Sequence, residues 1–124
     1  MPMLSTRERV EKLIAMAEQG KFLEAIEEFY APDATMQENN QPRRAGLAAL
    51  LENERRVLDS LQEIRVNRAD SFIVEGDRAA IHWVYHFIDR QGRELRRDEI
   101  AYQEWRDGKI IRERFFYAGE ATKK

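Results

Sequence analysis

The second half of this 124-residue chain contains four long segments in which apolar and polar residues alternate, and this period of two constrains the fold more than any other feature. Alternation places successive side chains on opposite faces, as in a β-strand with one buried face. The short sequences EGD, DRQG and RDG separate the segments, and their glycines supply the positive φ that a tight hairpin needs. We therefore expect an antiparallel meander of strands over residues 63–74, 78–88, 94–105 and 110–117.

The first half of the chain shows helical spacing instead. Ser5 and Glu8 are spaced as a capping box, which predicts a helix that begins at Thr6 and ends before Gly20. A shorter helix follows and stops before Pro32, because the residue before a proline is disfavoured in the helical region. A short strand, DATMQE, precedes a third helix. The apolar stripes of the three helices are Val10, Leu13, Ile14 and Ala17; Phe22, Ile26 and Phe29; and Leu47, Leu50, Leu51 and Leu58.

Composition indicates one globular domain over residues 1–124. Apolar residues make up 43% of the chain and charged residues 35%, with a net charge of −2 and the two signs interspersed. Proteins that bind nucleic acid gather Lys and Arg on one face, so we expect no nucleic-acid partner. The absence of cysteine excludes disulfides and thiolate chemistry. No signal-peptide pattern or membrane-length apolar run occurs, so we expect a cytoplasmic protein without a membrane partner.

His82 and His86 are the only histidines, and both lie in the strand segment AAIHWVYHFI. Strand residues rise about 3.3 Å each, which puts the two side chains roughly 13 Å apart and too far to share a zinc ion. Either histidine could act alone on a ligand, or lie half-buried on the outer surface of a sheet. No phosphate loop, nucleophile elbow or dinucleotide fingerprint is present, so we expect no metal and no cofactor.

Two segments, FYAPDATMQENNQPRRAGLAAL and EIAYQEWRDGKIIRERFFY, resemble a known family in their order and spacing. They resemble the nuclear transport factor 2-like superfamily, and in particular its SnoaL-like and ketosteroid isomerase-like group, over nearly the whole chain. The resemblance implies an α+β fold, with a cone-shaped, curved antiparallel sheet and three N-terminal helices packed on its concave face. Isomerases, cyclases, dehydratases, epoxide hydrolases and non-catalytic binders share this fold, so the resemblance implies a pocket but no single activity.

The resemblance also implies a role for Glu38, at the end of DATMQE. In ketosteroid isomerase-like members a carboxylate at the matching place is the general base. The tyrosine and the aspartic acid that bind the enolate oxygen in that group fall on Leu13 and on or near Ala101 in this sequence. Loss of one such donor costs about 10² to 10³ in rate, so we do not expect ketosteroid isomerisation. Glu38 could equally be a solvated acid at a strand end.

The resemblance turns Glu99 and Glu113 toward the interior of the cone, although a bulge in either strand would reverse the faces. We expect a small apolar or aromatic metabolite there, and cofactor-free isomerase, cyclase or lyase chemistry at Glu38, assisted by His86 or Gln103. The alternative is a non-catalytic module that binds a ligand or another protein. The expected ligand-binding residues are Trp83, His86, Glu99, Gln103, Glu113, Phe115 and Tyr117.

Large apolar groups on both faces of one strand predict an assembly. Trp83 and Tyr85 lie on one face of the segment, and Val84 and Ile88 lie on the other. If one face packs on the helices, the other exposes a patch larger than monomers usually tolerate. We therefore expect a homodimer that forms through the outer face of the sheet.

Overall fold

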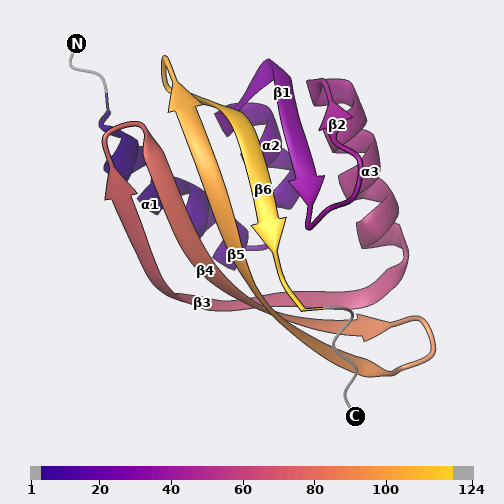
Figure 1. The fold of residues 1–124 in the computed structure, drawn as a ribbon. Helices are drawn as coiled ribbons and strands as arrows, with labels where there is room; N and C mark the ends of the chain where they lie inside the picture. Colours follow the sequence, from indigo (N-terminus) through magenta and orange to yellow (C-terminus); the bar gives the residue numbers. More distant parts are fainter. Residues whose placement is uncertain (1–3, 119–124) are drawn as a thin grey trace.

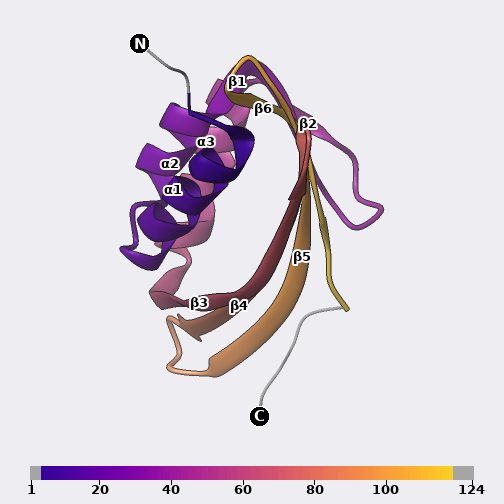
Figure 2. The same cartoon turned by 90° about the vertical axis from the view of Figure 1, so that its left-hand side faces the viewer.

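The chain forms a strongly curled sheet with three helices packed on its concave face, as Figure 2 shows. This computed structural model describes residues 4–118, apart from the side chains of residues 67–70. The helices are α1 (Thr6–Glu18), α2 (Phe22–Phe29) and α3 (Leu47–Asp59). The strands are β1 (Tyr30–Glu38), β2 (Arg44–Ala45), β3 (Leu61–Glu75), β4 (Arg78–Asp89), β5 (Glu94–Arg106) and β6 (Lys109–Phe116). The predicted α+β class is confirmed.

The strand order across the sheet is β2-β1-β6-β5-β4-β3 (Figure 1). Strands β3 to β6 form the predicted antiparallel meander in chain order. Strand β1 pairs with β6 in parallel, so the sheet is mixed and the expectation of a purely antiparallel sheet is wrong at this edge. Parallel neighbours need a crossover connection, and here β2, α3 and the meander all lie between the two strands along the chain.

The predicted capping box at the start of α1 is present. The Ser5 hydroxyl accepts from the backbone N–H of Glu8 at 3.1 Å, and the Glu8 carboxylate accepts from the N–H of Ser5 at 2.8 Å. Strand β1 begins at Tyr30, earlier than the DATMQE segment indicated, so Pro32 lies inside it. The register between β1 and β6 shifts between Tyr30 and Thr35, and a proline is tolerated there because no regular ladder needs its missing N–H.

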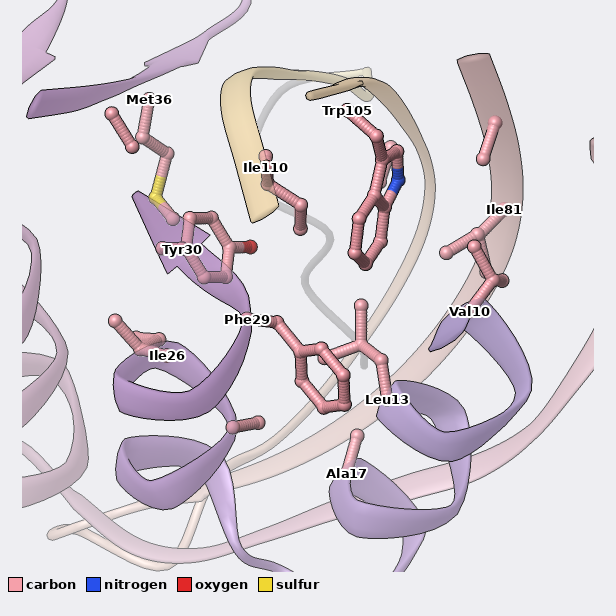
Figure 3. Packing of buried hydrophobic residues seen from close by; sticks show 14 of the residues in the cluster. Val10, Leu13, Ala17, Ile26, Phe29, Tyr30, Met36, Ile81, Trp105 and Ile110 are labelled. Carbon is pink, nitrogen blue, oxygen red and sulfur yellow. The ribbon is translucent and has the colours of Figure 1, made fainter. Parts of the chain in front are cut away.

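The hydrophobic core fills one end of the cone, near the β5–β6 turn. Figure 3 shows Phe29 of α2 and Leu13 of α1 pointing into one cluster with Trp105 of β5, and the Phe29 and Trp105 rings meet edge to face at 6.1 Å. Ile81 and Ile110 are fully buried in the same cluster. Farther from that turn, the inward side chains of β4, β5 and β6 border a cavity instead.

Candidate functional site

The cavity lies between the helices and the concave face of the sheet. Its volume is about 360 Å³, at the lower end of the ~300–1,000 Å³ that small-molecule sites span. Side chains of all three helices border it, and strands β1, β3, β4, β5 and β6 supply the remaining walls. Most of the lining is apolar or aromatic, including Leu13, Phe22, Ile26, Met36, Leu95 and Phe115.

One wall is an aromatic ladder on β4, formed by Trp83, Tyr85 and Phe87. Strand alternation places the three rings on one face. The rings of Trp83 and Tyr85 have centroids 6.0 Å apart, and those of Tyr85 and Phe87 stack at 5.7 Å with an interplanar angle of 7°. The ladder gives a flat ligand or a cation an extended aromatic surface.

Glu99 enters the cavity from β5 and is only 6% exposed. Its ion pair with Arg97 spans 3.7 Å, which is too long for a hydrogen bond, and Glu99 makes no hydrogen bond within the described part of the chain. Burial raises the pKa of Glu99 to about 8, against the lowering effect of the Arg97 guanidinium. Three nearby carboxyls add to the increase, those of Glu113, Glu38 and Glu54.

Glu113 on β6 is the acceptor in a buried hydrogen-bond network, and it is only 2% exposed. The Tyr30 hydroxyl donates a short hydrogen bond to one carboxylate oxygen, and the Gln103 amide donates to the other at 2.7 Å. The indole N–H of Trp105 donates to the Gln103 carbonyl at 3.0 Å. Burial raises the pKa of Glu113 to about 7, although the bonds from Gln103 and Tyr30 oppose this increase.

Glu38 lies at the rim of the cavity, where β1 ends. The Tyr117 hydroxyl donates to its Oε1 at 2.6 Å, and Arg44 Nη1 lies 3.4 Å from its Oε2. Asn39 follows with a φ of 49° and accepts from the backbone N–H of Tyr117 at 3.0 Å. The Arg97 guanidinium lies 4.1 Å from the centroid of the Tyr117 ring, which connects this rim to the cavity wall.

Five of the eight predicted site residues line the cavity: Glu38, Trp83, Glu99, Glu113 and Phe115. Gln103 lies behind the wall and positions Glu113, and Tyr117 positions Glu38 from outside. His86 does not line the cavity. In the sheet register it lies opposite Arg65 of β3 and Arg96 of β5, and its side chain is on the convex face, away from the aromatic ladder. The expectation that His86 assists Glu38 inside the cone is therefore wrong.

The predicted site does not include six polar residues of the cavity lining, and the pKa values of three of these, Glu54, Tyr30 and Tyr85, are shifted. Glu54 of α3 points into the site from a position that interrupts the stripe of Leu50 and Leu58, and this interruption was the available signal. Burial raises the pKa of Glu54, with a contribution from the Glu38 carboxyl. Burial also raises the pKa of Tyr30 and Tyr85, the other two groups, well above the ordinary value.

A family model for the SnoaL-like domain matches residues 10–113. The chain belongs to the SnoaL-like family. A Mesorhizobium loti protein described as a SnoaL-like polyketide cyclase has a TM-score of 0.78 at 22% identity, covering 92% of this chain and 100% of its own. An NTF2-like protein of unknown function from Burkholderia pseudomallei has a TM-score of 0.81 at 15% identity, covering 94% and 92%. TerC, co-crystallised with polyporic acid, has a TM-score of 0.78 at 20% identity, covering 91% of each chain.

At these identities the structural similarities establish the fold of this SnoaL-like protein. The family match confirms the predicted resemblance to the SnoaL-like group. No curated protein gives a significant match. Among the described residues, no helix is long and apolar enough to cross a membrane. Within residues 4–118, apart from the undescribed side chains, no three acidic or histidine residues are grouped to hold a metal ion.

Proposed function

We propose that this SnoaL-like chain acts as a single domain that binds one small, largely apolar or aromatic molecule in the cone and transfers a proton to or from it. The chemistry is of the isomerase, cyclase or lyase type and needs no cofactor. The cavity supports the binding step, because its lining is mainly apolar and its polar groups are few and converge on it.

The raised pKa of the buried Glu99 carboxyl is the observation that supports the proton-transfer step. A carboxyl with a pKa of about 8 is mostly protonated at neutral pH, so it can donate a proton or a hydrogen bond to a ligand oxygen. Glu38, which a hydroxyl and a guanidinium hold at the rim, supplies the proton acceptor. Carboxyls in contrasting environments are a common way to divide acid and base roles in one site.

The relatives support this proposal only in general terms. One of them is described as a SnoaL-like polyketide cyclase, and TerC was co-crystallised with polyporic acid, which supports the use of this fold for small molecules. The two donor positions expected from the ketosteroid isomerase-like group are apolar here, Leu13 and the fully buried Ala101. Glu99 lies two residues before Ala101 on the same face of β5 and provides a donor from a different position.

A non-catalytic binding module is the second candidate. One observation favours it, because both carboxylate oxygens of Glu38 already have partners in Tyr117 and Arg44. In that function the cavity holds a ligand without converting it, and the acidic side chains provide orientation alone.

A ligand screen distinguishes the two candidates. A library of small apolar and aromatic compounds is tested for hits that raise the melting temperature, and each hit is followed by NMR for conversion. We expect Glu99→Gln and Glu38→Gln each to lower turnover by about 10² or more while the ligand still binds. Glu94→Gln, on the outward-facing start of β5, is the matched control. Hits that bind but are never converted, or are converted at an undiminished rate by both variants, contradict the catalytic roles.

We further propose that two copies associate through the convex face of the sheet, and that the protein works in the cytoplasm without nucleic-acid or membrane partners. The large side chains exposed on that face support the assembly. Ile100 and Phe116 pair directly across β5 and β6 and are 41% and 43% exposed. Ile73 of β3 lies on the same face and is 70% exposed.

A further inference from the structure

The charged groups that line the cavity are strongly unbalanced. Four carboxyls reach it from four different elements: Glu38 of β1, Glu54 of α3, Glu99 of β5 and Glu113 of β6. Arg97 is the one guanidinium in the described lining. Like charges in a partly desolvated space repel one another, which favours the protonated carboxyls, so a positive charge placed among them stabilises their ionised forms.

Two of these carboxyls lack the partners that the other two have. Glu38 has Tyr117 and Arg44, and Glu113 has Tyr30 and Gln103. Glu99, more than nine-tenths buried, has only the long 3.7 Å contact with Arg97.

Glu54, the fourth carboxyl, has neither a hydrogen bond nor an ion pair with any described residue. Glu54 is half-buried. An ionised carboxyl that is partly removed from water and has no donor is unfavourable, and a ligand that brings a donor or a positive charge offsets this cost.

The aromatic ladder is the second, independent feature. The faces of Trp83, Tyr85 and Phe87 attract cations through their quadrupoles, and desolvated cases are the strongest. This wall already holds one cation in the structure, because the Arg97 guanidinium lies 5.3 Å from the centroid of the Phe87 ring. The acidic groups of α3 and β5 and the aromatic groups of β4 border the same cavity.

We propose that the ligand of this cavity is an organic cation, a small molecule with a protonated amine or quaternary ammonium on an apolar or aromatic body. Its nitrogen lies between the carboxyls of Glu54 and Glu99, and its substituents contact the rings of Trp83 and Tyr85. The inference rests on the proposed use of the cone as a small-molecule site and narrows the class of molecule that enters it.

The proposal predicts the direction in which the affinity for the ligand changes with pH. The titratable groups that face the ligand are Glu38, Glu54, Glu99, Glu113, Tyr30, Tyr85 and Arg97. A bound cation favours the ionised carboxyls, so its affinity increases as the pH rises through the range of about 7 to 8, and binding releases protons. An anionic ligand, which would use Arg97 and the protonated carboxyls, has the opposite dependence.

Three probes of one shape separate the ligand classes. They are phenethyltrimethylammonium, the neutral tertiary alcohol with carbon in place of nitrogen and hydroxyl in place of one methyl, and phenylpropanoate. Calorimetry is done at about pH 6 and about pH 9, in buffers of different ionisation enthalpy. We expect the ammonium to bind about tenfold more tightly than the alcohol at the higher pH, and to lose about tenfold at the lower pH. The quaternary nitrogen does not titrate, so the change reports the protein.

Single substitutions test which carboxyls bind the ammonium group. Glu54→Gln and Glu99→Gln should each weaken ammonium binding about fivefold or more and leave the alcohol unaffected. Glu52→Gln is the control, because Glu52 lies on the same helix but pairs with Arg56 at the surface. The inference is wrong if the ammonium does not bind, if the alcohol binds as tightly, or if phenylpropanoate binds best. In the last two cases the cavity still takes a small molecule, so the proposed function stands while its cationic class fails.

Discussion

At the scale of single residues, the cavity depends on carboxyls that stay protonated where solvated ones would not. Burial raises the pKa of Glu99 to about 8 and that of Glu113 to about 7, so folding takes up protons that the unfolded chain has already lost. The stability that these groups contribute is fully present below about pH 4.5 and is lost progressively as the pH rises to about 7 for Glu113 and about 8 for Glu99.

This uptake predicts an unusual pH profile of stability. We expect the free energy of unfolding to fall by up to about 1.4 kcal/mol per pH unit for each group, from about pH 5 to about pH 8 for Glu99 and to about pH 7 for Glu113. Asp89 and Asp98 have lowered pKa values and therefore act only at lower pH, outside this window. Urea unfolding across the window measures the slope, and carboxyl chemical shifts against pH give the two midpoints.

Glu99→Gln provides the sharpest check of that profile. The amide keeps the shape but cannot ionise, so the variant should match the wild type near pH 5 and exceed its stability near pH 9. Glu94→Gln, at an exposed position on the same strand, should leave the slope unchanged. A wild-type stability that is flat from pH 5 to pH 8 would mean that neither carboxyl is buried in solution as it is here.

At the scale of elements, the sequence predicted the local structure correctly wherever a few neighbouring residues determine it. The capping box at Ser5 and the glycine turns of the meander are such cases, since each depends on residues within four positions. The parallel pairing of β1 with β6 was missed, because it joins residues about 80 positions apart and leaves no local pattern.

The site was predictable where alternation alone fixed a face. Glu99, Gln103 and Glu113 lie inward because the β5–β6 pairing keeps its register from Ile100 to Glu104. His86 was assigned to the cavity against the alternation of its own strand, and it lies outside. Which inward residues border a cavity and which fill the core depends on how the sheet curls over the helices, and sequence periodicity carries no information about that curvature.

The β5–β6 turn offers a prediction for an element. Asp107 and Gly108 both have positive φ, 52° and 78°, as a two-residue hairpin requires. We expect Gly108→Ala to cost about 1 kcal/mol from backbone strain, measured by urea unfolding. A Cβ there would lie 2.8 Å from Cζ of Arg9, but that contact is the free end of a flexible side chain and should yield.

Gly92→Ala is the matched variant, because Gly92 has a φ of 81° and open space around it. The two substitutions should therefore cost nearly the same. A much larger cost at Gly108, relieved when Arg9→Ala is added, would show that the guanidinium is held in place against the turn.

At the scale of the whole molecule, the two faces of the sheet have different surroundings. The helices and the cavity occupy the concave face, whereas no element covers the convex face within residues 4–118 (Figures 1 and 2). Apolar side chains on that face therefore meet solvent unless another molecule covers them. A second copy is the simplest cover, because a two-fold interface brings the same patch to both sides.

We predict that the protein is a homodimer in solution, with Ile73, Ile100 and Phe116 in the interface. Light scattering at micromolar concentration should give twice the chain mass of 14.7 kDa. Ile100→Asp and Phe116→Asp each place a charge in an apolar contact and should shift the mass to that of the monomer. Ala48→Asp, at an exposed position on α3, should stay dimeric. A monomeric wild type would contradict the prediction, and so would a dimer that neither convex-face variant weakens, because its interface would then lie elsewhere.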